Sequence, residues 1–285
     1  MRYGFTTGSC AAAASKAAAY MLLTGKAKNK ITIQTPKGIA YTADITDIKR
    51  SENEVSCAAI KDGGDDPDVT TGAYIYASVR ILHSDTCALC KKKQDLVIIN
   101  IDGVGRVTKP GLDQPVGNAA INHVPREMIK KEVREVCELL DFKGTLDITI
   151  SVPKGKELAE RTFNPRLGIV GGISILGTSG IVEPMSSQAL IDTIRVELRQ
   201  RYSFGYDYVA VAPGNYGLDF MKESYGYDLD RSVKCSNFIG ETIDMAADMG
   251  FKRMLLTGHI GKLIKVAGGI MNTHSREADC RIELL

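Results

Sequence analysis

Three glycine-rich loops carry the residue types that could bind a small anionic ligand. They are Gly177-Thr-Ser-Gly180, Gly214-Asn-Tyr-Gly217 and Gly258-His-Ile-Gly261, and each lies between a predicted strand and a predicted helix. Glycine lets the backbone approach a ligand, and the N–H groups at a helix N-terminus favour negative charge. Loops at the carboxyl edge of one parallel sheet commonly bind nucleotides. We therefore predict a nucleotide-like ligand held by Gly177, Thr178, Ser179, Gly180, Gly214, Asn215 and Gly258, with Glu183 accepting from a ribose diol. The alternative is that the glycines serve only tight strand-to-helix turns.

The sequence lacks the patterns that identify the commonest nucleotide ligands. Gly171-Gly172 followed by Gly177 is not the G-x-G-x-x-G of dinucleotide-binding folds. Gly258-His-Ile-Gly-Lys262 lacks both the spacing of a P-loop and the Ser or Thr that follows its lysine. These absences disfavour a dehydrogenase and a P-loop NTPase. S-adenosylmethionine fits the remaining pattern, because its carboxylate suits a helix N-terminus such as Ser186-Ser187.

Four aspartates crowd the segment Lys61-Asp-Gly-Gly-Asp-Asp-Pro-Asp-Val-Thr-Thr-Gly72. Carboxylates this close could bind a divalent cation, but the segment lacks the spacing and the final Glu of a calcium loop. Aspartate and glycine also form ordinary turns. We therefore expect a polar loop that faces the active cleft, and no dedicated metal site.

Hydroxyl side chains surround the start of an Ala-rich helix predicted from Ser9 to Leu23. Thr6, Thr7 and Ser9 could hold an anionic group there, and the alternative is an ordinary N-cap, for which Ser9 is the candidate.

Histidines and cysteines add one further candidate. His259 lies in a glycine loop and is predicted to be functional, whereas His83, His123 and His274 are expected to be structural. Cys87-Ala-Leu-Cys90 lacks the second pair of ligands that structural zinc needs, so we interpret it as a surface turn.

The order of predicted elements changes along the chain. In the N-terminal part, strands are predicted at 30–35, 40–48, 54–60, 74–82, 95–101 and 145–152, with a helix at 124–140. After residue 166, strands at 169–176, 207–212 and 253–257 each precede a glycine loop and a helix, and further helices are predicted at 237–249 and 275–285. This pattern predicts an α+β domain over residues 1–158 and an α/β domain with a mainly parallel sheet over residues 159–285.

Composition narrows the function classes. The chain has 285 residues, 44% of them hydrophobic and 25% charged, with a net charge of +2. These values are ordinary for a globular protein and give no bulk signature of nucleic-acid or membrane binding. The seven scattered cysteines and the polar N-terminus indicate reduced thiols in the cytoplasm.

Five stretches together resemble the CbiD family, the cobalt-precorrin-5B C1-methyltransferases of anaerobic cobalamin biosynthesis. They cover almost the whole chain in order and lie at 2–16, 61–72, 103–112, 171–186 and 258–267. Members of the family commonly continue past the helix that stops here at Leu285, which suggests a truncated chain.

The resemblance implies methyl transfer from S-adenosylmethionine to carbon 1 of a cobalt tetrapyrrole, giving cobalt-precorrin-6A. It also implies a first domain like ribosomal protein S5 domain 2, on the tetrapyrrole side, and a second domain on the S-adenosylmethionine side. Cobalt would arrive inside the substrate. The carboxylates of the tetrapyrrole need cations and N–H donors, for which the candidates are Arg106, Lys109, Lys262 and Lys265, together with Thr6, Thr7 and Ser9. Asp62, Asp65, Asp66 and His259 are the candidates for moving a proton.

Two other function classes stay open at this point. S5-like domains occur in small-molecule kinases, so Gly103-Val-Gly105 and the aspartates could bind ATP and magnesium for phosphoryl transfer. A non-catalytic tetrapyrrole-binding protein is the third class. In every case we expect a small-molecule ligand, no nucleic acid and no membrane, and a homo-oligomer or transient contact with neighbouring pathway enzymes would be compatible with the sequence.

Overall fold

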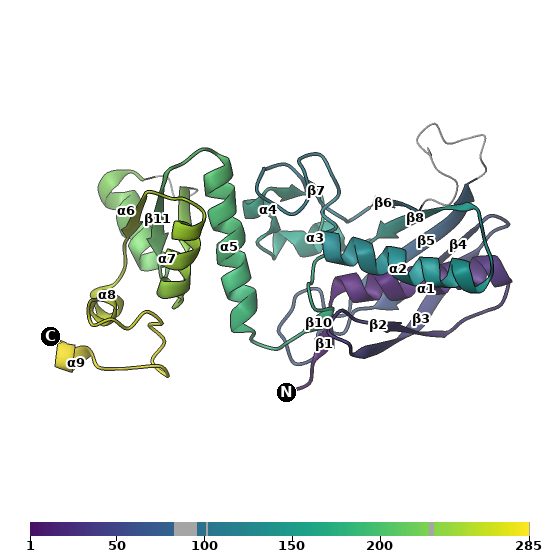
Figure 1. Ribbon diagram of the computed structural model, residues 1–285, viewed down its shortest axis with the longest axis horizontal. Coiled ribbons are helices and arrows are strands. Elements are labelled where there is room, and N and C mark those ends of the chain that lie inside the picture. Colours follow the sequence, from purple (N-terminus) through teal and green to yellow (C-terminus); the bar gives the residue numbers. More distant parts are fainter. Residues whose placement is uncertain (83–95, 101, 228–230, 285) are drawn as a thin grey trace. The chain divides into compact units, whose positions relative to one another are not determined.

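The computed structural model describes residues 1–82, 96–100, 102–227 and 231–284, and of residues 96–100 only the backbone. Two compact units are present (Figure 1). The first comprises Met1–Lys109 and Asp113–Met185, and the second comprises Pro110–Leu112 and Ser186–Leu285. His83, Cys87 and Cys90 lie outside the described residues. The described part of the chain contains no helix that is both long and apolar enough to cross a membrane.

A six-stranded sheet covered by two helices forms the first unit. The strand order is β2-β3-β4-β5-β8-β6, antiparallel except for the parallel pair β6 and β8. The strands are β2 (Lys30–Gln34), β3 (Ala40–Arg50), β4 (Glu54–Ile60), β5 (Tyr74–Leu82), β6 (Leu96–Asn100) and β8 (Thr145–Ser151). In β2, buried and exposed residues alternate, as expected for a sheet with one face toward the core. These elements confirm the strands predicted in the N-terminal part.

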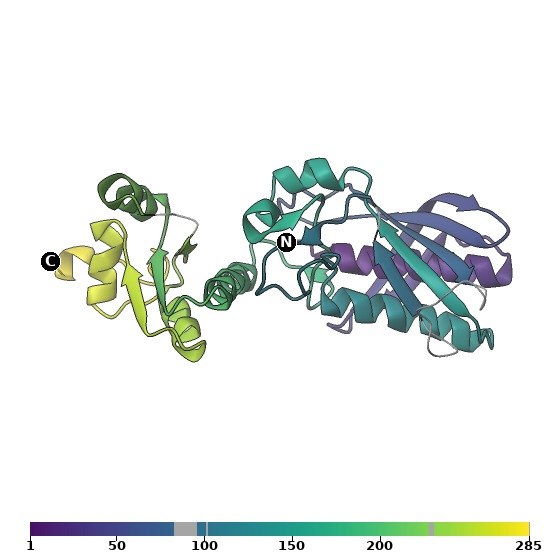
Figure 2. The same cartoon turned by 90° about the horizontal axis from the view of Figure 1, so that it is seen from above.

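Two long helices, α1 (Thr7–Thr24) and α2 (His123–Leu139), lie side by side on this sheet (Figures 1 and 2). The alanines of α1 are fully buried, because α2 and strands β2 to β5 cover this helix on several sides. Alanine lets these elements approach closely, which explains the Ala-rich sequence without a ligand. Gly25 follows α1 in the left-handed conformation, as expected for a helix stop.

Short strands tie residues 159–185 to the first unit. β9 (Ile169–Val170) pairs with β7 (Arg106–Val107), and β10 (Ile181–Val182) pairs with β1 (Gly4–Phe5). Two short helices, α3 (Gly155–Glu160) and α4 (Asn164–Leu167), precede β9. The sequence groups residues 159–185 with the α/β domain, whereas these pairings place them in the first unit.

The predicted strand at 169–176 is wrong in length and in partner. β9 has two residues and ends at Val170, before Gly171, which has φ +86°. Ile173 and Ile175 then make isolated bridges to Val104 and Ile121, and their side chains are buried in the core of the first unit. The apolar run reflects burial in that core and not membership of a parallel sheet.

A three-stranded parallel sheet of order β12-β11-β13 forms the centre of the second unit. Its strands are β11 (Tyr208–Ala212), β12 (Ser232–Lys234) and β13 (Arg253–Leu256), so its third strand is β12 and not the predicted strand at 169–176. The helices are α5 (Ser187–Ser203), α6 (Asn215–Tyr225), α7 (Ile239–Asp248) and α8 (Ile260–Ala267). Helices α5 and α7 contact each other and pack on the sheet through an apolar core that includes Leu198, Val211 and Ile239.

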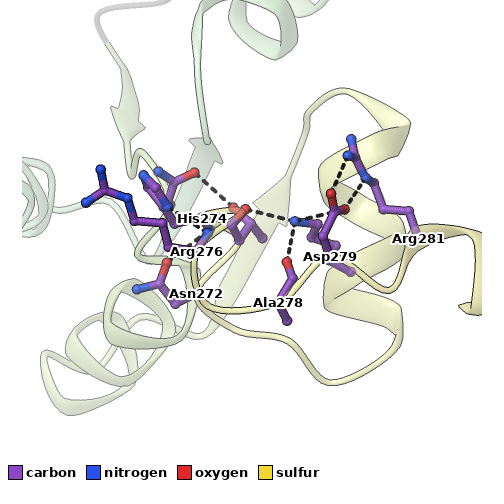
Figure 3. Close-up of polar contacts among 9 residues, drawn as sticks. Asn272, His274, Arg276, Ala278, Asp279 and Arg281 are labelled. Carbon is purple, nitrogen blue, oxygen red and sulfur yellow. Dashed lines mark hydrogen bonds and ion pairs between the residues drawn. The ribbon is translucent and has the colours of Figure 1, made fainter.

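The predicted C-terminal helix at 275–285 is also wrong in length. Within the described residues, only α9 (Arg281–Leu284) is helical there. The preceding residues form a loop that packs against α8 and is held by polar contacts (Figure 3).

Candidate functional site

Three segments far apart in sequence meet in the first unit, and we call residues 2–10, 61–72 and 177–183 together the glycine-loop cluster. β1 pairs with β10, Thr6 N–H donates to Gly180 O at 3.1 Å, and Phe5 N–H donates to Asp62 O at 2.8 Å. These bonds bring together the predicted substrate hydroxyls, the aspartates and the Gly177–Gly180 loop. The sequence placed that loop beside the Gly214 and Gly258 loops at one sheet edge, and this is wrong, because Gly177–Gly180 follows no strand of the parallel sheet.

The cap of α1 is Thr6 and not Ser9, which corrects the predicted start of the helix. Thr6 has extended backbone angles, and its Oγ1 accepts from Ser9 N–H at 3.2 Å. Ser9 Oγ instead donates to Gly180 O at 2.7 Å. Thr7 is buried, and in the described part of the chain its hydroxyl has no hydrogen-bond partner. One hydroxyl of the predicted trio is therefore still available to a ligand.

Several glycines of this cluster are required for close packing. A Cβ at Gly4 would lie 2.2 Å from the backbone of Gly63, and a Cβ at Gly177 would lie 2.7 Å from Cγ2 of Thr6. Gly180 has φ +77°, and its Cβ would lie 2.8 Å from Cβ of Thr35. The space beside Gly177 and Gly180 is thus filled by protein, which supports the simpler interpretation of these two glycines.

Arg2 is the centre of an ionic network with the aspartate loop. Its guanidinium forms a bidentate ion pair with Asp62, in which Nη2 and Oδ1 are 2.9 Å apart. Its backbone N–H donates to Oδ2 of Asp65 at 2.6 Å. The hydrogen bonds from Arg2 and from Gly64 N–H hold the pKa of Asp62 below its ordinary value. Asp62 is therefore an ionised, paired group and a weak base. Asp66 Oδ1 accepts from Met185 N–H at 3.1 Å.

Lys61 anchors the other end of the aspartate loop. Its side chain is buried and makes an ion pair with Asp68, and its Nζ donates to Oγ1 of Thr70 at 2.5 Å. Burial alone would raise the pKa of Asp68, but the charge and hydrogen bond of Lys61, with hydrogen bonds from Thr70, hold it below its ordinary value. The lysine thus fixes the loop that carries the predicted catalytic aspartates.

Glu183, predicted to accept from a ribose, forms an ion pair with Lys37. Ser179 is used in the local turn, because its Oγ accepts from Ile181 N–H at 3.2 Å and its carbonyl accepts from Lys37 N–H at 3.1 Å. Glu183 is partly exposed, so a ligand would have to compete with Lys37 for its carboxylate.

The second unit contains a topological switch point. From β11 the chain passes through α6 to β12 on one side, and then through α7 to β13 on the other side of β11. The loops after β11 and β13 therefore diverge, and open parallel sheets bind ligands in the crevice at such a point. These loops carry the predicted residues Gly214, Asn215, Gly258 and His259. A Cβ at Gly214 would meet nothing within 4 Å, so this loop leaves open space where Gly177 does not.

Polar side chains connect the three carboxyl ends of this sheet, and we call Gly214–Tyr216, Lys234–Asn237 and Gly258–Lys262 together the switch-point cluster. Lys234 Nζ donates to Oδ1 of Asn215 at 2.6 Å. Lys262 Nζ donates to Oδ1 of Asn237 at 2.9 Å, and partial burial lowers the pKa of Lys262. The edge is therefore basic and rich in amide groups.

His259 caps α8 through its ring. Its Nδ1 accepts from Gly261 N–H at 3.1 Å, which requires an unprotonated Nδ1. The ring contacts Tyr216 edge to face, with centroids 5.4 Å apart. Nε2 is then the proton-bearing nitrogen of the neutral ring, so this geometry suits a hydrogen-bond donor better than a base.

The four basic residues predicted to bind substrate carboxylates have different surroundings. Arg106 is exposed and donates to Gly117 O, and Lys109 Nζ donates to Arg166 O at 3.1 Å. Lys265 is buried, donates to Ala278 O at 2.6 Å and lies 3.6 Å from Oδ1 of Asp279, which also pairs with Arg281 (Figure 3). These contacts give Lys265 a structural role, because they hold the C-terminal loop to α8.

Sequence reasoning missed Arg2, Lys61 and Lys234. Arg2 and Lys61 lay within segments that were singled out, but their partners become visible only when the segments meet. Lys234 ends a three-residue strand, which is too short to leave a periodic signal. In the described part of the chain, no group of three or more His, Cys, Asp or Glu side chains is arranged to hold a metal ion.

Comparison with known proteins decides the family. The model of the CbiD family matches residues 1–184. The chain belongs to the CbiD family. Relatives named cobalt-precorrin-5B C(1)-methyltransferase match all of this chain. The protein from Ruminiclostridium cellulolyticum is 51% identical over 71% of its own length, that from Alkaliphilus metalliredigens 50% over 72%, and that from Methanocaldococcus jannaschii 42% over 75%.

A solved structure is also similar to this CbiD-family chain. It is the 1.9 Å crystal structure of the cobalamin biosynthesis protein (cbiD) from Archaeoglobus fulgidus, which is 23% identical and gives a TM-score of 0.48 over 99% of this chain and 84% of that chain.

Proposed function

We propose that this protein methylates carbon 1 of cobalt-precorrin-5B with S-adenosylmethionine as the donor. The observation that carries the proposal is the similarity along the whole chain to relatives named for this reaction. The order of the five sequence stretches, from the N-terminal segment to the Gly258 loop, supports it. No contact in the described residues favours phosphoryl transfer over methyl transfer.

The switch-point cluster is the better candidate for the donor. S-adenosylmethionine supplies a methyl group already activated on a sulfonium, so the protein needs to align and shield the reactants and does not need a nucleophile of its own. The open space beside Gly214, the amide of Asn215 and the exposed ring of Tyr216 fit a nucleoside with an amino-acid tail. A donor role for Gly177–Gly180 and Glu183 stays a prediction, and the close packing of these glycines weighs against it.

The glycine-loop cluster is the candidate for the tetrapyrrole. The free hydroxyl of Thr7 and the N-terminus of the long helix α1 suit the carboxylates of the substrate. Arg106, which is exposed on β7 of the same unit, is a separate candidate for binding a carboxylate. Asp65 and Asp66 keep carboxylate oxygens that could accept a proton from the ring. Asp62 is a weaker candidate, because its ion pair with Arg2 stabilises the charged form.

Replacing Gly214 with valine is expected to weaken binding of S-adenosylmethionine at least tenfold while lowering the unfolding midpoint only slightly, because Gly214 is the N-cap of α6 and valine is a poorer cap. Gly214 has an extended backbone with φ −168°, which any residue adopts, and its Cβ meets no protein atom within 4 Å. Apart from this small loss at the cap, the added side chain begins in open space, where a ligand of this loop would lie. Calorimetric titration measures the affinity for S-adenosylmethionine, and thermal unfolding measures the midpoint. Unchanged affinity would move the donor away from this loop.

The reaction itself is tested by incubating the full chain with cobalt-precorrin-5B and S-adenosylmethionine carrying a ¹³C-methyl group. We expect one added methyl by mass spectrometry, assigned to carbon 1 by NMR. Tight binding of the tetrapyrrole without methylation, in the presence of the donor, would indicate a binding protein instead. Protection from unfolding by ATP and magnesium, with none by S-adenosylmethionine, would indicate phosphoryl transfer.

Three finer points belong to the same proposal. The six-stranded sheet with α1 and α2 on it is the part of the chain that we assign to a fold like ribosomal protein S5 domain 2. Assembly into a homo-oligomer and contact with neighbouring pathway enzymes stay predictions, as does a cytoplasmic location.

A further inference from the structure

Lys234 stands at a position that selects the ligand in parallel nucleotide-binding sheets. It is the last residue of β12 and lies in register with Ala212 on β11, directly before the Gly214 loop. From there its ammonium group reaches the first residue of α6, with Nζ 2.6 Å from Oδ1 of Asn215. Lys234 therefore belongs to the switch-point cluster, although it comes from a different strand than the glycine loops.

The side-chain partner of Lys234 is a neutral amide. Within residues 1–82, 96–100, 102–227 and 231–284, no carboxylate pairs with its ammonium group. The carboxylate of Glu197 accepts from its backbone N–H at 3.3 Å, and its side-chain partner is a neutral amide oxygen. Lys262 repeats this arrangement with the amide oxygen of Asn237 at 2.9 Å. Among the described residues, two ammonium groups that lack a carboxylate partner thus flank the carboxyl end of β12.

The sign of the charge at this position carries information about the ligand. In dinucleotide-binding sheets, the residue that follows the first glycine turn by about 20 positions contacts the ribose. An acidic residue there accepts from the ribose hydroxyls, and a nearby arginine instead accommodates a phosphate on the ribose. Lys234 follows Gly214 by about this spacing and is basic. A basic residue here suits an anionic group better than a ribose diol, and the carboxylate is the anionic group that S-adenosylmethionine carries.

We propose that Lys234 binds the carboxylate of the amino-acid part of the methyl donor. The inference rests on the proposed function, since it takes S-adenosylmethionine as the ligand of the switch-point cluster. An ammonium group held in place by Asn215 and lacking a carboxylate partner would make a charge-assisted hydrogen bond without first breaking an ion pair. The nucleoside part would then lie at the ends of the neighbouring strands β11 and β13. There it would meet the aromatic pair Tyr216 and His259 and the open Gly214 loop.

The test compares two ligands that differ in the carboxylate. S-adenosylhomocysteine carries the amino-acid tail, and 5′-methylthioadenosine lacks it. We expect Lys234→Gln in the full chain to weaken S-adenosylhomocysteine about tenfold by calorimetry, because a hydrogen bond to a charged group is lost, and to change 5′-methylthioadenosine less than twofold. Lys252→Gln is the matched control, because Lys252 is exposed at the opposite end of the same sheet. This control should change neither affinity.

Each other outcome overturns the inference in a distinguishable way. Equal weakening of both ligands would place Lys234 at the ribose or in the fold. Unchanged affinity for S-adenosylhomocysteine, with weaker binding of the tetrapyrrole, would make the substrate the source of the anionic group. If the wild-type protein methylates cobalt-precorrin-5B and Lys234→Gln binds both nucleosides normally, the proposed function stands and the role of Lys234 falls. If the wild-type protein binds neither nucleoside and transfers no methyl group, both fall.

Discussion

Replacing Lys61 with methionine is expected to lower the free energy of unfolding by about 3 kcal/mol. The side chain of Lys61 is only 3% exposed, and its partner Asp68 is 23% exposed. Methionine fills much of the same volume but leaves the carboxylate of Asp68 without its cation. Breaking a largely buried pair by removing one partner leaves an uncompensated charge, which costs far more than losing a surface pair. Urea unfolding followed by circular dichroism measures the loss.

The matched control for this variant is Lys30→Met in the same unit. Lys30 pairs with Asp44 at 3.2 Å, but the two side chains are 72% and 75% exposed. We expect this control to change stability by less than about 0.5 kcal/mol. A similar small change for Lys61→Met would mean that water reaches the Lys61–Asp68 pair. The loop of Asp62, Asp65 and Asp66 would then be held mainly by Arg2 and by its hydrogen bonds with the backbone N–H groups of Phe5 and Met185.

The pH dependence supplies a second check with a defined sign. In the wild-type protein the folded-state pKa of Asp68 is lowered, so its contribution to stability is complete above the unfolded pKa of about 3.9 and is lost as the pH falls through the folded value. Without Lys61, burial is opposed only by the hydrogen bonds from Thr70, so the pKa of Asp68 is higher in the variant than in the wild type. The deficit in stability of the variant relative to the wild type should therefore shrink as the pH falls below about 4. A deficit independent of pH would assign the loss to packing.

The strands of the first sheet could be predicted because their signals are local. In β2 and β3, side chains alternate between the core and the exposed face, and a turn with Pro36 and Gly38 separates these two strands. The two-residue strands β1, β7, β9 and β10 could not be predicted, since each exists only through pairing with a distant segment. The run at 169–176 misled for the same reason, because an apolar run indicates burial without saying which core buries it.

The same distinction between local signals and contacts between distant segments applies to the candidate sites. The sequence identified the segments that carry the polar residues, because glycine, aspartate and hydroxyl residues cluster there. It could not show that Gly177 packs on Thr6 whereas Gly214 faces open space, since this depends on what the fold brings beside each glycine. Nothing in the local sequence distinguishes Lys234 from the other lysines. Only the strand order β12-β11-β13 places it beside the Gly214 loop.

Gly177→Ala should lower the stability of the first unit by about 3 kcal/mol, the sum of two effects. Gly177 has φ +131°, a conformation that costs a non-glycine residue about 1–3 kcal/mol. The new Cβ would also lie 2.7 Å from Cγ2 and 2.8 Å from Cβ of Thr6, the residue that caps α1. The cap must move or the loop must withdraw, and hydrogen exchange of peptides from α1 would report which helix end loosens.

Gly171→Ala separates these two effects within the same segment. Gly171 has φ +86°, but its Cβ would meet nothing within 4 Å, so this variant keeps the backbone strain and omits the clash. We expect it to cost about 1 kcal/mol, and the remaining difference measures the contact with Thr6. Adding Thr6→Ser to Gly177→Ala should recover part of that difference, because serine keeps the capping oxygen and loses Cγ2. Equal costs for Gly171→Ala and Gly177→Ala would show that the loop has room for a side chain, and Gly177 would then return as a candidate for contact with the donor.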